Sequence, residues 1–357
     1  MASHYGAVPT RSCCGAFRDA LMDCWLRCRA GSGVRCCCCC PLKVPTKSRA
    51  LAYAQAHCLY VDADAAVENR AAVEVERAAL PPKARGAIRI VVASDTHSRH
   101  IDLGVLPHGD LFVHCGDILM SARLWTDAGQ VDKLRAFNAW LGSPAVPCAT
   151  KVVIMGNHDS VAPKLGKEQL AAVLTNATYL ENDLLGEGGG GEGKGGCLTG
   201  CSGLRIFATP LSRGRSGNAA YQDDAFAAAT EAAAANVAEP VDIFITHGPS
   251  QSNITSNSTP GELESWARHL RPRLHLWGHA HELHGVRIDD EVVSVCASIS
   301  DIRYRAEQLA VVVDLTPRGG GGGGGGGGCD AGVLVGGEEE KNGTGDGTRR
   351  RGSSNRA

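Results

Sequence analysis

Residues 87–94 read AIRIVVAS, and the residues that follow are Asp95, Thr96 and His97. So short a run of mostly apolar, β-branched residues predicts a strand buried in a sheet. Asp95 and His97 leave this strand two positions apart, and side chains alternate along an extended chain, so both are expected on one side. Polar residues directly after a buried strand are typical of a ligand site at the edge of an α/β sheet.

The chain alternates predicted strands and helices from this point to about residue 316. Further strands are predicted at residues 111–115, 151–155, 204–208, 241–246, 274–278, 291–296 and 310–315. One helix has clear boundaries, because residues 259–262 form a capping box with Pro260 at the first helical position, and Pro272 ends it. The alternation predicts an α/β catalytic domain over residues 87–316.

The two ends of the chain differ in composition from this domain. Residues 1–50 carry eight Lys or Arg and two Asp, and the alanine-rich residues 51–80 predict one helix. We therefore expect residues 1–86 to be an extension that is largely disordered or forms one helix. The glycine-rich stretch 186–203 is expected to be a loop insertion, and residues 317–357, with ten consecutive glycines, a disordered tail.

Composition excludes several classes of protein. The 357 residues carry a formal charge of −2, which argues against a nucleic-acid partner. No apolar run is long enough to predict a transmembrane helix. Ten of the sixteen cysteines lie in the first 58 residues, and the chain begins without an apolar signal segment. Five of those cysteines are adjacent, a spacing unsuited to disulfides. We expect an intracellular, cytoplasmic protein.

The tract Cys36–Cys40 leaves three interpretations open. Basic residues surround it, so the cysteines could be S-acylated and attach the protein to a membrane. The Arg-rich, acid-poor segment could instead be part of an organelle transit peptide. The third interpretation is a compositionally biased tail without a specific role.

Five short polar motifs follow predicted strands. They are Asp95-Thr96-His97, Gly116-Asp117, Gly156-Asn157-His158-Asp159, Thr246-His247-Gly248 and Gly278-His279-Ala280-His281. Their carboxylate, imidazole and amide groups suit divalent zinc, manganese or iron. The seven candidate ligands are Asp95, His97, Asp117, Asn157, His247, His279 and His281. Seven ligands are too many for one tetrahedral ion and fit two metal ions that share one carboxylate. The glycines before Asp117, Asn157 and His279 would permit sharp turns.

The order of these motifs resembles the calcineurin-like metallophosphoesterase superfamily over about residues 88–315. Longer strings resemble its metallophosphoesterase-domain-containing subgroup, which includes cyclic-nucleotide phosphodiesterases. These strings are SDTHSR (94–99), HCGD (114–117), LTNATYL (174–180), THGP (246–249) and GHAHE (278–282). The resemblance implies a four-layer α/β/β/α sandwich of two mixed sheets flanked by helices.

The resemblance also implies a role for each motif residue. Asp95, His97 and His281 would hold the first metal, Asn157, His247 and His279 the second, and Asp117 would bridge them. A hydroxide bridging the metals would attack phosphorus. His158 would not be a ligand; it would stabilise charge on the phosphoryl group and protonate the leaving oxygen.

Three departures from related patterns bear on substrate class. Asp117 is followed by Ile-Leu-Met-Ser instead of the Asp-Arg-Gly of protein phosphatases, and Asp159 stands in place of a glutamate. Ser250 occupies the position of a second proline in the subgroup. The first two differences disfavour a protein phosphatase, and Asp159 leaves open what orients His158. Ser250 would change one side of the substrate pocket. Loop arginines, namely Arg99, Arg213 or Arg215, could replace the missing positive charge.

We therefore expect a phosphodiesterase that acts on small nucleotides or cyclic nucleotides and uses two divalent ions of Mn, Fe or Zn. The alternatives are a phosphomonoesterase or protein phosphatase, and a non-catalytic scaffold with the same fold. The oligomeric state stays open. Of the other histidines, His114 is expected to be structural, His100 and His284 to be solvated loop residues, and His269 and His275 to have no chemical role.

Overall fold

The computed structural model describes residues 48–65, 71–120, 125–186, 201, 203–213, 217–250, 262–289 and 291–318. The Cys36–Cys40 tract, nearly all of the 186–203 insertion and the tail from residue 319 lie outside these ranges. Among the described residues, no helix combines the length and apolar character needed to cross a membrane.

Two mixed β-sheets form the centre of the fold. The first has the strand order β2-β1-β13-β3-β4-β5-β6 and the second β11-β12-β10-β9-β8-β7. The strands of the first sheet are β1 (His57–Asp62), β2 (Val73–Glu76), β3 (Ile88–Ala93), β4 (Gly109–Cys115), β5 (Cys148–Ile154), β6 (Thr178–Tyr179) and β13 (Ala310–Leu315). Those of the second are β7 (Asp183–Leu185), β8 (Ile206–Thr209), β9 (Ile243–Thr246), β10 (Leu274–Trp277), β11 (Gly285–Asp289) and β12 (Val292–Cys296).

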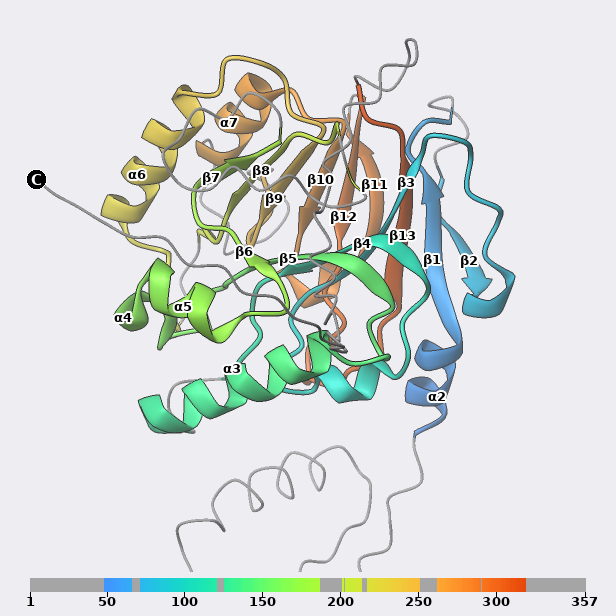
Figure 1. Ribbon diagram of the computed structural model, residues 1–357, viewed down its shortest axis with the longest axis horizontal. Helices are drawn as coiled ribbons and strands as arrows, with labels where there is room; N and C mark the ends of the chain where they lie inside the picture. Colours follow the sequence, from blue (N-terminus) through green and yellow to red (C-terminus); the bar gives the residue numbers. More distant parts are fainter. Residues whose placement is uncertain are drawn as a thin grey trace, which may run out of the picture. The chain divides into compact units, whose positions relative to one another are not determined.

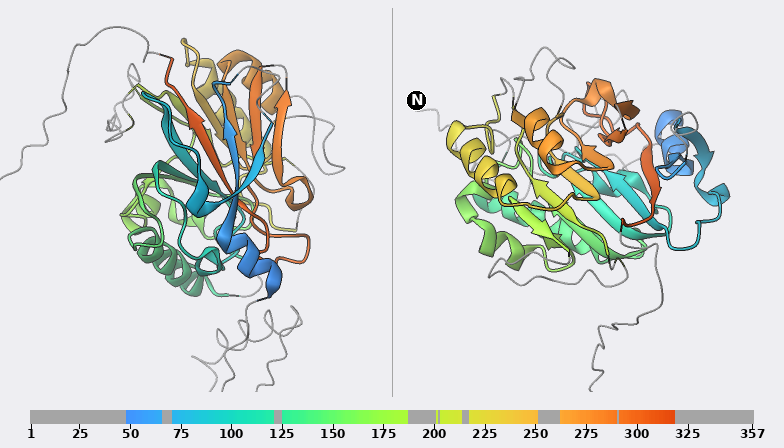
Figure 2. Two further views of the ribbon diagram at one scale, coloured as in Figure 1. Left: turned by 90° about the vertical axis from the view of Figure 1, so that its right-hand side faces the viewer. Right: turned by 90° about the horizontal axis from the view of Figure 1, so that it is seen from above.

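The sheets pack face to face, and helices cover their outer faces (Figures 1 and 2). Ile90 and Val92 of β3 share one buried cluster with Ile243 and Ile245 of β9, whereas Val91 points to the other side of its sheet. Helices α3 (Asp127–Leu141), α4 (Ala162–Leu165) and α5 (Lys167–Val173) cover the first sheet, and α6 (Asp224–Ala235) and α7 (Glu262–Leu270) the second. The expected sandwich of two mixed sheets flanked by helices is confirmed.

Strands buried on both faces explain why the sequence shows continuous apolar runs here instead of alternation. Strands β3 to β6 pair in parallel, as do β8, β9, β10 and β12. Their carboxyl ends therefore meet at one edge of each sheet, which is where the polar motifs begin.

The single helix expected over residues 51–80 is wrong. The structure has a short helix, α2 (Arg49–Ala56), whose N-cap Ser48 Oγ accepts a hydrogen bond from the Leu51 N–H at 3.0 Å. The chain then forms β1, which pairs in parallel with β13, and β2, which pairs with β1. Cys58 and Val61 of β1 are fully buried. Pairing with an available sheet edge and burial of these side chains outweigh the helix propensity of the alanines.

Arg77 connects this segment to the rest of the sandwich. Its guanidinium donates hydrogen bonds to four carbonyls, those of Ala54, His57, Leu103 and Val105, at 2.6–3.1 Å. Two of the four belong to the loop that follows Asp95 and His97. Residues 57–62 and 73–76 thus form part of the first sheet, although they precede residue 87.

We predict that a fragment spanning residues 87–318 is less stable than one spanning 48–318. The shorter fragment exposes the edge of β13 and loses the buried side chains of Ala54, Cys58 and Val61. Apolar burial of this size corresponds to a melting temperature about 10 °C lower or more. Thermal unfolding of both fragments, followed by circular dichroism, measures the difference. Equal melting temperatures would show that residues 48–86 do not belong to the folded unit.

Candidate metal centre and active site

The five polar motifs meet at the carboxyl ends of their strands. Asp95 and His97 follow β3, Asp117 follows β4, Asn157 follows β5, His247 follows β9, and His279 and His281 follow β10. Potential metal-binding atoms lie within 4.8 Å of one another in three groups, Asp95-His97-His281, His97-Asp117-His158 and Asp117-His247-His279. The seven ligands predicted from the sequence therefore come together from both sheets, with His158 beside them.

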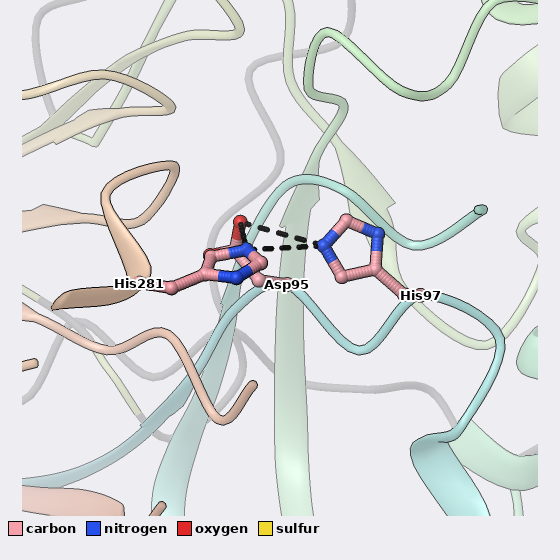
Figure 3. A group of neighbouring side chains, drawn as sticks. All are labelled: Asp95, His97 and His281. Carbon is pink, nitrogen blue, oxygen red and sulfur yellow. Dashed lines mark hydrogen bonds and ion pairs between the residues drawn. The ribbon is translucent and has the colours of Figure 1, made fainter. Parts of the chain in front are cut away.

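The first group contains hydrogen-bond acceptors that face one another (Figure 3). His97 Nδ1 lies 3.0 Å from the carbonyl of Leu119, and His281 Nδ1 lies 3.0 Å from the carbonyl of Asp301. In a neutral ring these contacts place the proton on Nδ1, so each Nε2 carries a lone pair. The Nε2 atoms of His97 and His281 lie 3.2 Å apart, and Asp95 Oδ1 lies 3.3 Å from His281 Nε2. A cation between these three side chains would satisfy all of them.

The second group repeats this arrangement. His247 Nδ1 lies 2.8 Å from the carbonyl of Cys115, which leaves the lone pair on Nε2. That Nε2 faces Asn157 Oδ1 at 3.0 Å and Asp117 Oδ1 at 3.2 Å. The Asn157 amide nitrogen donates to the carbonyl of Asn218, which turns the amide oxygen toward His247 and His279. Imidazole, carboxylate and amide oxygen converge here as they do in sites for zinc, manganese and iron.

Asp117 lies between the two groups. Its Oδ1 faces His247 in the second group, and its Oδ2 lies 3.9 Å from His97 Nε2 in the first. Burial alone would raise the pKa of Asp117, but the charge of His247 and its neighbours holds it well below the usual range. Burial lowers the pKa of His247, whereas the Asp117 carboxylate raises it, to about 9 overall. The site thus favours positive charge next to Asp117.

His158 lies beside the ligands with its ring against that of His97, at a centroid distance of 4.7 Å. Its Nε2 lies 3.2 Å from the Asn218 side-chain nitrogen and 3.9 Å from Asp117 Oδ2. The backbone N–H of His158 donates to Asp117 Oδ1 at 2.8 Å. Asn218 and Asp117 therefore orient His158, which answers the question that the sequence left open.

Residues 88–283, more than half of the chain, match the family described as calcineurin-like phosphoesterase. The chain belongs to the calcineurin-like phosphoesterase family. Metallophosphoesterase domain-containing protein 1 of Homo sapiens, like its Mus musculus counterpart, is 30% identical over 278 residues, which is 66% of this chain and 74% of the relative. The crystal structure of TT1561 from Thermus thermophilus aligns with 65% of this chain and all of that one, at a TM-score of 0.40 and 13% identity.

The Asp159 carboxylate of this calcineurin-like phosphoesterase accepts hydrogen bonds from backbone N–H groups and does not orient His158. Its carboxylate accepts hydrogen bonds from the N–H groups of Gly156 at 2.8 Å and Leu119 at 2.7 Å. Because Leu119 follows Asp117, Asp159 joins the loops that carry two of the predicted ligands. Asp159, which stands in place of a glutamate, therefore has a structural role and holds the two loops together.

The segment after β12 supplies parts of the site that sequence reasoning missed. Tyr304 lies against three histidine rings, with centroid distances of 4.8 Å to His97, 5.1 Å to His281 and 5.9 Å to His158. Ser300 Oγ donates to the carbonyl of Asp95 at 2.6 Å. These residues lie beyond the part of the chain that matches the family, and no short motif marks them. Asn218 lies within that part, but it too belongs to a loop that carries no recognisable motif.

Three other histidines can be assigned. His114 is buried, and its Nε2 lies 3.1 Å from Thr96 Oγ1, so its expected structural role is supported. His100 is not the solvated loop residue expected; it is buried against Phe137 and Trp140. The ring nitrogens of His284 are also buried, again contrary to expectation.

The backbone of the site is strained. Asp95, Asp117 and His279 have φ angles of 55°, 54° and 68°, a left-handed conformation that residues with a Cβ rarely adopt. Of the motif glycines, Gly116 has a φ of +96° and makes the turn predicted for it. Gly278 instead permits close approach, since a Cβ there would overlap Ser94 Oγ and Asp95 Oδ2. Gly156 likewise leaves no space for a Cβ beside Asp117.

We predict that Gly278→Ala loses most of its bound divalent metal, although no ligand is replaced. The added methyl group pushes Asp95 out of position and costs about 1–3 kcal/mol of stability. Metal content per chain, measured by mass spectrometry after metal loading, tests this. Gly129→Ala in α3 is the control, because its Cβ would meet no atom closer than 3.4 Å. Wild-type metal content in Gly278→Ala would contradict the assignment of Asp95 as a ligand.

Proposed function

We propose that the chain is a phosphodiesterase that uses two divalent metal ions and acts on a small substrate, such as a nucleotide or cyclic nucleotide. The observation that carries the proposal is the convergence of two acceptor groups on either side of Asp117, with His158 alongside. All seven candidate ligands and the candidate acid are present, which argues against a scaffold that keeps the fold without the chemistry.

The ligand assignment follows the two groups. Asp95, His97 and His281 would hold one cation, Asn157, His247 and His279 the other, and Asp117 would touch both. When bound, manganese, iron or zinc ions supply Lewis-acid activation of water and of the phosphoryl group. The contacts of the histidine Nδ1 atoms with backbone carbonyls keep the ligating nitrogens oriented without further rearrangement.

His158 is the proposed proton donor. Its ring is not needed to complete either set of three ligands, and it is held at the site by Asn218 and by packing against His97. From there it can give a proton from its imidazole to the oxygen that leaves phosphorus. Tyr304, in the segment after β12, packs against the rings of His158 and His281. We assign Tyr304 to the wall of the site that contacts the organic part of the substrate.

Charge favours a diester over a monoester. A monoester dianion requires more positive charge than a diester, which carries one charge fewer. Two arginines in loops near the motifs are already paired with carboxylates, Arg99 with Asp102 at 2.8 Å and Arg213 with Asp224 at 3.0 Å. Of the loop arginines considered from the sequence, the two within the described residues are therefore committed elsewhere, and Arg215 lies outside those residues. Intracellular location and acylation of Cys36–Cys40 stay predictions, since residues 1–47 lie outside the described ranges.

The diesterase proposal predicts a higher kcat/KM for a bis-nitrophenyl phosphodiester than for the matching nitrophenyl monoester. Both are assayed with the same metal ion, and Mn²⁺, Fe²⁺, Zn²⁺ and Mg²⁺ are supplied in turn. A clear preference for the monoester with every metal would reject the diesterase and favour the phosphomonoesterase. Turnover of neither ester by a metal-loaded chain would favour the scaffold.

Replacing His158 with alanine should preserve fold and metal content and lower turnover by about 10²–10⁴-fold, the usual effect of losing a general acid. The loss should be smaller for nitrophenyl esters than for alkyl esters, because nitrophenolate leaves without a proton. A Brønsted series of leaving groups measures the difference. If the loss is the same across the series, His158 stabilises the phosphoryl oxygens and does not protonate the leaving group.

A further inference from the structure

A second candidate site lies at the far end of β10 from the metal centre. A cavity of about 740 Å³ is bounded by the C-terminal end of α7, the N-terminal ends of β10 and β12, and Arg318. Strand β10 starts at this cavity and ends next to Gly278 and His279. None of the predicted metal ligands lines the cavity. Its volume is within the range of small-molecule sites.

Positive charge predominates around the cavity. Its charged lining residues are Arg268, Arg271, Arg273, Arg318, Glu264 and Glu291. Two of the arginines are neutralised, Arg268 by Glu264 at 2.7 Å and Arg273 by an ion pair with Asp64. Among the described residues, no carboxylate pairs with the guanidinium of Arg271 or Arg318. The positive charges of these two guanidinium groups are therefore not compensated by an ion pair, although the carboxylate of Glu291 also lines the cavity.

The Arg318 side chain contacts the backbone of Arg271. The guanidinium of Arg318 donates to the backbone carbonyl of Arg271 at 2.8 Å and to that of Val241 at 2.6 Å. Burial lowers the pKa of Arg318, and although Asp242 opposes this, the like charges of Arg273 and Arg271 lower it further. An anion bound here would relieve that repulsion.

The cavity wall is continuous with a predicted metal-ligand loop. His275 lines the cavity, is 2% exposed, and has both ring nitrogens engaged. Its Nε2 lies 2.8 Å from Thr246 Oγ1, and its Nδ1 lies 3.2 Å from Ser250 Oγ. Thr246 and Ser250 flank His247. Ser250, which replaces a proline of the related subgroup, supplies a hydroxyl that proline lacks. This role for His275 was not expected from the sequence.

We propose that this cavity binds a small phosphorylated molecule, with its phosphate held by Arg271 and Arg318. Guanidinium groups match phosphate oxygens in shape and charge, and charge-assisted hydrogen bonds are the strong ones. The cavity is larger than a phosphate group, and its hydroxyl and imidazole groups, from Ser250, Ser294 and His275, line the space for the rest of the molecule. Because His275 in its wall contacts Thr246 and Ser250, which flank His247, occupancy can influence the metal centre.

Equilibrium dialysis with radiolabelled inorganic phosphate tests the site on the metal-loaded full chain. We expect two phosphates per chain, one at the metal centre and one in the cavity. Removing the metal ions with a chelator should release only the phosphate at the metal centre. The phosphate that stays bound then tests the cavity independently of the proposed function. The variant Arg271→Ala/Arg318→Ala should lose only the second, and Arg135→Ala, an exposed arginine on α3, should match the wild type.

A second variant guards against misfolding, because Arg318 also holds two backbone carbonyls. Arg271→Glu removes one cation and adds an anion, and should weaken the chelator-resistant phosphate at least about tenfold. The proposal is overturned if the chelated wild type binds no phosphate. It is also overturned if the folded arginine variants bind phosphate as tightly as wild type after chelation.

Discussion

The site depends on a cluster of buried hydrogen-bond acceptors that requires positive charge. In each of two groups, histidine nitrogens, a carboxylate oxygen and further acceptor atoms approach one another to about hydrogen-bond distance. Backbone carbonyls fix this arrangement, because each accepts a hydrogen bond from the Nδ1–H of a histidine and so directs its Nε2 inward. In a buried site such convergence is unfavourable without positive charge. The pKa of His247 is raised because a proton on this histidine supplies positive charge beside Asp117.

The fold meets this demand by joining two sheets at one edge. Parallel strands from each sheet deliver their motifs to the same place, and Asp117 extends from the first sheet to the His247 of the second. Asp159 braces the loops after β4 and β5, and Gly156 and Gly278 let the chains approach where a methyl group would not fit. The left-handed φ angles of Asp95, Asp117 and His279 show that the surrounding packing holds these loops against local preference.

Sequence patterns predicted the parts of the molecule that local chemistry determines. The buried strands, their order of motifs and the seven candidate ligands could be read because apolar runs and adjacent polar groups are local signals. The N-terminal segment could not, since β1 owes its form to pairing with β13, about 250 residues away. Tyr304 and Asn218 reach the histidines from loops without a motif. The role of His275 became visible only when its contacts with Thr246 and Ser250 were known.

Metal analysis of the purified full chain tests the central claim most directly. After exposure to Mn²⁺, Fe²⁺ or Zn²⁺ and removal of excess ion, inductively coupled plasma mass spectrometry gives the metal bound per chain. Two acceptor groups that share Asp117 predict close to two ions per chain, and a strong loss of both in Asp117→Asn, whose amide is a weaker ligand for either. A wild-type chain that retains close to no metal, or an Asp117→Asn chain that retains two, would contradict the account.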